Sequence, residues 1–188
     1  SPTLTIPVLC GLPLLVTVAN VREEKNHLRQ VAAMRQLFSE GLRFRWVNIG
    51  SLANAPLVEK LRQAVRSAGL EDYFTLTGPL DNPYGVMRRA DAVCVLSDHE
   101  SWSMVITEAK ALGVPVIATR TSGALEQITD GENGLLCGFS AEEAAAAIRA
   151  FLTGGAAETM RRDAKRPAAE TSRDTLEALL ANDTQKAL

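Results

Sequence analysis

The sequence lacks the features that mark membrane-spanning, disulfide-bonded and nucleic-acid-binding proteins. No apolar run approaches the roughly 18 residues that a membrane span needs, and the apolar stretch 5–19 is interrupted by prolines and has no basic leader, which argues against a signal peptide. The three cysteines are far apart and form no CxxC pair, so we expect Cys94 and Cys137, which lie in apolar runs, to be reduced thiols in the core of a cytoplasmic protein. The formal net charge of −2 gives no indication of nucleic-acid binding.

Three ligand-binding fingerprints are also missing. No GxGxxG follows the first expected strand, which weakens the case for a dinucleotide site, and no GxxxxGK[ST] is present, which excludes a P-loop. The sequence has no DxD pair of the kind that holds a divalent metal under a diphosphate, and its Cys and His spacing offers no zinc site. We therefore expect no metal and no cofactor. An anionic ligand would have to be neutralised by Lys25 and by free N–H groups at a helix start.

What is present is an alternation of apolar runs and helical patterns. We expect strands over residues 14–21, 43–50, 73–78, 91–97, 114–119 and 134–137. We expect helices over residues 25–38, 55–70, 82–90, 103–112 and 141–152, with further helix up to about residue 181. Apolar strands separated by helices predict an α/β fold with a Rossmann-like, doubly wound parallel sheet, whose ligands bind at the carboxyl ends of the strands.

The length of 188 residues and the apolar content of 46% are typical of one domain with a sizeable core. We expect residues 1–13 to be an extended lead-in from a preceding domain. Residues 14–153 would form the ligand-binding domain, and residues 154–188 a C-terminal helical tail.

The segment "SDHESWSMVITEAKALGVPVIAT", residues 97–119, combines a polar loop, a helical pattern and a strand. We expect Ser101, Trp102, Ser103 and Met104 to form the first turn of the helix, with N–H groups directed at the ligand edge. Glu100 would then lie in the loop and Glu108 one turn inside the helix. Two acceptors would flank a patch of donors, which suits hydroxyls at each end and phosphate in the middle, as in a sugar nucleotide.

Three segments, in the right order, resemble those of group 1 glycosyltransferases (GT4-like). "ESWSMVITEAKALGVPVIAT" resembles the family's E-x7-E segment and the strand after it, and "TSGALEQITDGENGLLC" resembles the Gly-Gly-x-x-E…G-x-N-G-L-L stretch that follows. "VANVREEKNHLRQVAAM" resembles the strand–loop–Lys–helix opening. The likeness runs from about residue 14 to about residue 152, so the sequence resembles the C-terminal, donor-binding domain of a glycosyltransferase with the GT-B fold.

The resemblance implies roles for particular residues. Glu100 would contact the hydroxyls of the transferred sugar near the reacting centre of a retaining enzyme, and Lys25 would neutralise the diphosphate leaving group. Glu108 would accept hydrogen bonds from the ribose. The other donor-binding positions implied are the amides around Trp102, Ser103 and Met104, the backbone near Gly78, Pro79 and Leu80 for the base, and Asn20.

The resemblance also implies the partners. The donor would be a hexose linked to UDP, GDP or ADP, transferred without a metal, and the acceptor would be bound by an N-terminal domain outside this sequence. We therefore expect this chain alone to bind donor but not to catalyse transfer. The protein would be cytoplasmic, at the inner face of the membrane if it associates peripherally with lipid; the basic segment 161–166 is more simply a solvated helix face.

One departure from the family keeps other functions open. The usual Gly-Arg after the first strand is Ala19–Asn20 here, and a neutral hydrogen bond is about half as strong as a charge-assisted one. A non-catalytic nucleotide-sugar-binding or assembly module is therefore an alternative. Half of a GT-B-type sugar-nucleotide epimerase is another, although the uninterrupted E-x7-E pattern argues against it.

The same residues also have simpler interpretations. Glu108 could be a solvated helix residue, Glu100 could accept only backbone N–H bonds at the helix start, and Lys25 could be plain surface charge. Trp102 is more easily explained by packing than by stacking on a base. We expect Glu126 to orient the loop after the fifth strand.

Overall fold

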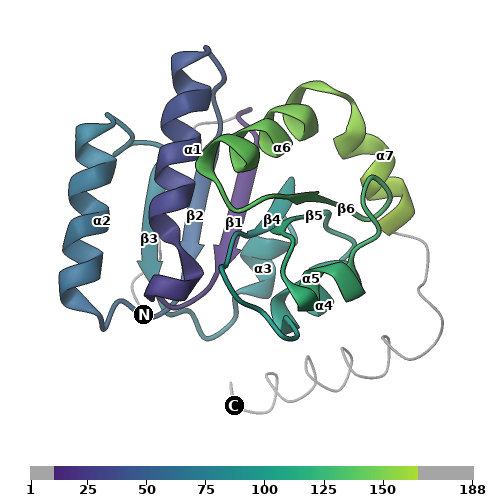
Figure 1. The fold of residues 1–188 in the computed structure, drawn as a ribbon, viewed down its shortest axis with the longest axis horizontal. Helices are drawn as coiled ribbons and strands as arrows, with labels where there is room; N and C mark the ends of the chain where they lie inside the picture. Colours follow the sequence, from purple (N-terminus) through teal and green to yellow (C-terminus); the bar gives the residue numbers. More distant parts are fainter. Residues whose placement is uncertain (1–10, 165–188) are drawn as a thin grey trace.

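The computed structural model describes residues 11–164, with side chains up to residue 160. The expected lead-in up to residue 10, the tail beyond residue 164 and the side chains of the basic segment 161–166 lie outside this range. The described part forms a six-stranded parallel sheet with helices on both faces (Figure 1). The predicted fold class is confirmed.

The sheet has the strand order β3-β2-β1-β4-β5-β6. Its strands are β1 (Leu14–Val18), β2 (Arg45–Ile49), β3 (Phe74–Gly78), β4 (Ala92–Val95), β5 (Val116–Thr119) and β6 (Gly134–Cys137). The chain builds outward from β1 to β3, and then returns to place β4 on the other side of β1. The strand order therefore reverses between β1 and β4, and ligands of open α/β sheets bind in the crevice at this switch point.

Helices cover the two faces of the sheet, and each face has its own apolar core. The helices are α1 (His27–Ser39), α2 (Ala55–Ser67), α3 (Tyr84–Met87), α4 (Met104–Ala111), α5 (Ser122–Gln127), α6 (Ala141–Thr153) and α7 (Ala156–Ala164), with a 3-10 turn η1 (Glu23–Lys25) before α1. One core lies under α1, α2 and α6, and the other lies under α3, α4 and α5 (Figure 1). Successive strand residues serve opposite cores, as Leu15 and Val16 do in β1, because side chains alternate along a strand.

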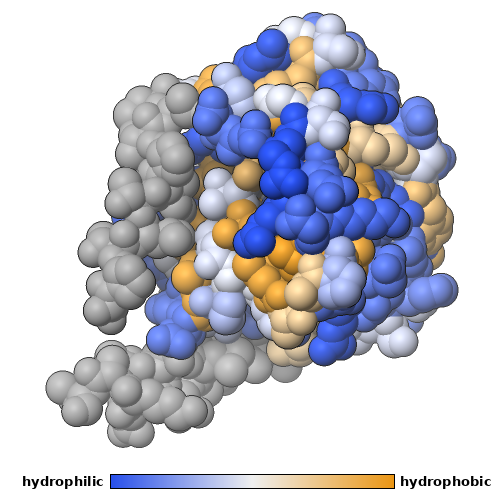
Figure 2. All heavy atoms as spheres, turned by 90° about the vertical axis from the view of Figure 1, so that its left-hand side faces the viewer, coloured by the Kyte–Doolittle hydropathy of each residue, from blue (hydrophilic) through white to orange (hydrophobic). Residues whose placement is uncertain are grey.

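The surface seen from the side of β3 and α2 is mostly hydrophilic, with apolar side chains visible between the polar ones (Figure 2). Within residues 11–164 no helix is long and apolar enough to cross a membrane.

The helix expected over residues 25–38 begins later than predicted. Lys25 belongs to η1, and α1 starts at His27. The reason is Asn26, whose φ of 48° and ψ of 53° put it in the left-handed region, where a right-handed helix cannot continue. The Asn26 side chain accepts a hydrogen bond from the Arg29 N–H and so caps α1.

The helix after β4 also begins later than predicted. Ser101 and Trp102 precede α4, and Ser103 is its N-cap in an extended conformation rather than a residue of its first turn. The Ser103 hydroxyl accepts from the Ile106 N–H at 3.3 Å, a bond that a residue already inside the helix would not make.

The helix α5 has no counterpart among the helices expected from the sequence. Its six residues are too few to show a helical period, and its start is marked only by the N-cap Thr121, whose side chain accepts from the Ala124 N–H.

Candidate functional site

A cavity of about 220 Å³ lies at the carboxyl ends of β1 and β4, at the switch point of the sheet. Its walls come from two stretches that are distant in the sequence, one around the end of β1 and one that runs from β4 into α4. Val18, Ala19 and Lys25 lie at the end of β1 and in η1, and Ser97 and Glu100 lie in the loop after β4. The start of α4, residues 103–105, closes the third side.

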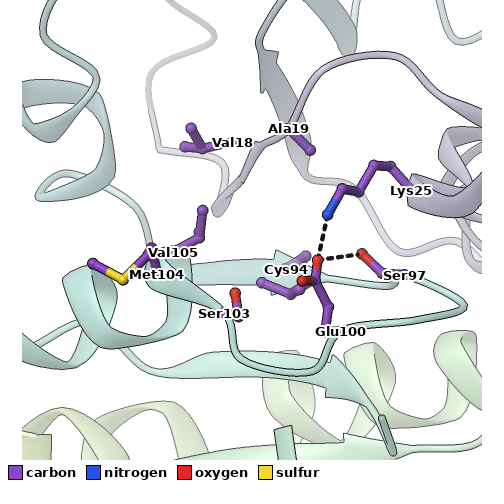
Figure 3. A pocket seen from close by; sticks show the side chains of 10 residues that line it. Val18, Ala19, Lys25, Cys94, Ser97, Glu100, Ser103, Met104 and Val105 are labelled. Atoms are coloured by element: carbon purple, nitrogen blue, oxygen red, sulfur yellow. Dashed lines mark hydrogen bonds and ion pairs between the residues drawn. The ribbon is translucent and has the colours of Figure 1, made fainter. Parts of the chain in front are cut away.

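Lys25 and Glu100 point toward each other on one side of this cavity (Figure 3). The Lys25 Nζ lies 2.5 Å from Glu100 Oε1, and the Ser97 hydroxyl donates to the same oxygen at 3.0 Å. The Lys25 side chain is 25% exposed and the Glu100 side chain 14%, so solvent screens the two charges less than on an open surface. The structure therefore places Lys25 in the cavity wall, and its charge is not that of a freely solvated residue.

The Glu100 backbone is held from the side of α5. The Gly123 N–H donates to the Glu100 carbonyl at 2.7 Å, and the Ser122 hydroxyl donates to the same carbonyl at 3.2 Å. A Cβ at position 123 would lie 2.8 Å from the Glu100 carbonyl oxygen and from backbone atoms of Ser101, closer than Cβ atoms approach in real structures. Only glycine fits there without displacing the loop.

The N-terminus of α4 is fixed by Gln127, which is not among the site residues expected from the sequence. The buried Gln127 amide accepts from the Ser103 N–H at 3.0 Å, and donates to the Ser103 carbonyl at 3.0 Å and to the Thr107 hydroxyl at 2.8 Å. The Ser103 N–H, which we expected to bind ligand, is therefore already engaged. Among the described residues, the N–H groups of Met104 and Val105 have no hydrogen-bond partner, so the donors at this helix start are those two.

Glu108 lies one turn inside α4, four positions after Met104 and hence on the same face of the helix. Its carboxylate accepts from the Tyr84 hydroxyl at 3.0 Å. Burial raises the pKa of Glu108, and the bond from Tyr84 acts in the opposite direction. Glu108 is half-buried and held by a partner, unlike a solvated surface residue.

Glu108, Trp102 and the remaining predicted positions do not line the cavity. Asn20 is exposed after β1, and its Oδ1 accepts from the Ser51 N–H at 2.8 Å, which ties it to the loop after β2. Gly78 ends β3, and Pro79 and Leu80 follow it, two strands away from β1. They lie along the same edge of the sheet as the cavity, beyond β2.

Trp102 and Met104 flank the N-cap of α4, and their side chains are 54% and 52% exposed. Glu126, the residue expected to orient the loop after β5, is exposed, and its neighbour Gln127 makes the buried contacts. In the sequence, the only sign of Gln127 is a polar residue between the apolar residues Ala124 and Ile128. The structure shows that both of these neighbours are buried. Within residues 11–164, no three His, Cys, Asp or Glu side chains come together to hold a metal ion.

A doubly wound sheet with a cation, a carboxylate and a helix N-terminus at its switch point is an arrangement suited to a phosphorylated ligand. Residues 11–170 match the model of the family described as Glycosyl transferases group 1. The chain therefore belongs to that family, and its fold is that of one half of a GT-B glycosyltransferase.

Curated and solved proteins show the same relationship. The chain is 31% identical over 124 residues to N-acetyl-alpha-D-glucosaminyl L-malate synthase of Bacillus anthracis, covering 66% of this chain and 32% of that protein. It is 39% identical over 90 residues to D-inositol 3-phosphate glycosyltransferase of Arthrobacter sp. (strain FB24), covering 47% of this chain and 21% of that protein. The matches thus span a third or less of these relatives.

Among solved structures, HepE of Anabaena in complex with UDP-glucose superimposes with a TM-score of 0.75 at 21% identity. The match covers 92% of this chain and 49% of HepE, and it establishes the fold.

Proposed function

We propose that this domain binds the nucleotide-sugar donor of a retaining, metal-independent glycosyltransferase that transfers a hexose. The observation that carries the proposal is the pairing of Lys25 with Glu100 inside the cavity at the switch point, beside the free N–H groups of Met104 and Val105. These groups place positive charge and hydrogen-bond donors in the middle of the site. Carboxylates stand at either side, Glu100 in the loop and Glu108 in the helix.

The charges suggest how a donor would bind. A diphosphate at the start of α4 would be stabilised by the helix N-terminus and would attract Lys25 away from Glu100. The Glu100 carboxylate would then be free to accept hydrogen bonds from sugar hydroxyls, and Glu108 from those of the ribose. When the bond to the sugar breaks, charge develops on the nucleoside diphosphate, and the already oriented Lys25 and amides would stabilise it.

The rest of the proposal follows from the resemblance. The base would lie against the backbone at Gly78, Pro79 and Leu80, at the end of β3 and on the same edge of the sheet. Asn20 and Trp102 would lie at the margin of the site. The acceptor would be bound by an N-terminal domain, in the cytoplasm or at the inner face of the membrane. The UDP-glucose complex of HepE supports a UDP-linked donor, with GDP- and ADP-linked donors as the alternatives.

Calorimetry tests the proposal directly. The protein is titrated with UDP, GDP and ADP and with their glucose conjugates, with and without EDTA. We expect one nucleotide series to bind, EDTA to have no effect, and Glu108→Ala to weaken binding by about tenfold or more, since a hydrogen bond to a charged group contributes about 1.5–3 kcal/mol. Glu142→Ala, an exposed carboxylate on α6, is the matched control and should change nothing. Heat of binding from none of these ligands would contradict the proposal.

A non-catalytic nucleotide-sugar-binding or assembly module is the second candidate, favoured by Asn20 at the position of the family's arginine. The Asn20 side chain is occupied with the Ser51 N–H, as expected of a structural residue. Normal transfer by a full-length enzyme carrying Asn20→Ala would remove this argument. Turnover of a nucleotide sugar by the full-length protein without any acceptor would instead favour an epimerase.

A further inference from the structure

The two segments that supply the ion pair of the cavity are joined by other contacts as well. The Asp98 N–H donates to the Glu24 carbonyl at 2.8 Å. The Asp98 carboxylate accepts from Asn26 Nδ2, 3.3 Å from each carboxylate oxygen, and from the Arg29 guanidinium at 2.6 Å. The loop after β4 and the segment before α1 therefore lie side by side, and their alignment does not depend on the ion pair alone.

Arg29 contacts two residues of the stretch that runs from β4 into the Glu100 loop. Its side chain is only 8% exposed, and its second terminal nitrogen donates to the Leu96 carbonyl at 2.6 Å. The guanidinium carbon lies over the Phe139 ring, 5.9 Å from the ring centroid. A buried guanidinium is costly unless it is paired, and its planar fork fixes the spacing of the acceptors that it binds. Arg29 therefore holds the end of β4 and the start of the Glu100 loop at once.

Asn26 links the loop that carries Asp98 to the start of α1. It is the one non-glycine residue with positive φ in the described part of the chain. This conformation lets its Oδ1 accept from the Arg29 N–H at 3.2 Å while its Nδ2 points to Asp98. The residue that sets the start of the helix thus also contacts the loop.

We propose that Arg29 and Asp98 are positioning residues, which hold Glu100 in place when Lys25 exchanges its carboxylate partner for the phosphates of a donor. This inference rests on the proposed function. In the free protein the ion pair helps to hold the Glu100 side chain, and donor binding removes that contact. A loop held only by the pair would then lose its alignment, and reordering it would cost conformational entropy at the moment of binding. With Arg29 on Asp98, Glu100 stays directed at the sugar.

The inference predicts an unequal effect on the two halves of the donor, because Glu100 faces the sugar and Lys25 the diphosphate. Asp98→Ala should weaken binding of the nucleotide sugar by about tenfold and binding of the corresponding nucleoside diphosphate by less than about threefold. Asp98→Asn keeps an oxygen for Arg29 and should restore most of the loss. The measurement is calorimetry with whichever of the UDP, GDP or ADP pairs binds the wild-type chain. Equal losses for both ligands, or no loss, would overturn the inference.

The chain provides a matched control. Glu40 and Arg149 form a bidentate ion pair at the other end of α1, with distances of 2.7 and 2.6 Å. Glu40→Ala should leave both affinities unchanged.

A second measurement requires no nucleotide sugar. In Arg29→Lys, which keeps the charge but not the fork, amide hydrogen exchange at Asp98 should speed up by about tenfold, while exchange at Ala19, which donates to Ile49, should not change. If no nucleotide binds, the proposed function fails while this measurement still tests the alignment. Unchanged exchange at Asp98 would overturn the inference.

Discussion

At the scale of single residues, the site sits among groups whose burial changes their chemistry. His27 is the first residue of α1, two positions after Lys25, and it is only 3% exposed. Burial lowers the pKa of His27 to about 4, and the charge of Lys25 acts in the same direction. Among the described residues, neither ring nitrogen of His27 has a hydrogen-bond partner. His27 is therefore neutral in the folded protein at pH values where an unfolded histidine takes up a proton.

This difference predicts a loss of stability in acid. The unfolded pKa is about 6.5, so the unfolded chain binds more protons below that value, and stability falls as the pH drops from about 6.5 towards 4. Between about pH 7 and pH 4.5 the His27 contribution should lower the free energy of unfolding by about 2 kcal/mol. Urea unfolding at the two pH values measures it. His27→Leu should flatten the dependence by that amount, whereas His99→Gln, in an exposed loop, should not; equal slopes for wild type and His27→Leu would contradict the assignment.

At the scale of elements, the N-terminus of α4 depends on two polar side chains with different tasks. Ser103 caps the helix from within its own segment, and Gln127 holds Ser103 from α5. Ser103→Ala should lower the free energy of unfolding by about 1 kcal/mol, the usual effect of losing an N-cap.

Gln127→Leu should be more damaging, because it leaves the buried Ser103 N–H and carbonyl without that partner. We expect a loss of about 2–3 kcal/mol, from the desolvation of unsatisfied polar groups. Gln63→Leu, on the exposed face of α2, is the control and should stay within about 0.5 kcal/mol. Equal urea midpoints for the two leucine variants would show that the contact with Ser103 contributes nothing.

The elements also show which parts of the site can be predicted from sequence. Glu100 and Glu108 were predicted on the two sides of a loop-to-helix junction, because helix periodicity and strand ends are local signals. Lys25 was placed in a helix, since nothing local shows that Asn26 adopts positive φ. The partners Gln127, Asp98 and Tyr84 were not assigned a role, because their contacts join segments 20 or more residues apart.

At the scale of the whole molecule, α6 connects the β6 edge of the sheet to its centre. It follows β6 at one edge and packs against α1, which belongs to the half built on β1. Ile148 and Phe151 on α6 are fully buried in the core that α1 and α2 share. The doubly wound class was predictable from apolar strands alternating with helices, but the strand order that brings β4 beside β1 was not, because it depends on long-range pairing.

Truncating a core side chain of α6 should therefore destabilise the fold as a unit. Phe151→Ala should lower the free energy of unfolding by about 3–5 kcal/mol, through lost burial and the cavity left behind. Leu125→Ala, which truncates an exposed side chain on α5, should change it by no more than about 0.5 kcal/mol. Chemical denaturation of both variants checks this, and similar losses in the two would mean that α6 is not part of the cooperative core.

The two tryptophans of the sequence lie in opposite surroundings, and this gives the protein separate optical reporters. Trp46 is fully buried in β2, with its indole N–H donating to the Thr17 hydroxyl at 3.1 Å. Trp102 is 54% exposed beside the cavity. Emission from Trp46 will be shifted to shorter wavelength and protected from a dissolved quencher, while emission from Trp102 will be red-shifted and accessible. Fluorescence can therefore follow the opening of the core and the occupation of the site as two distinct signals from an unlabelled chain.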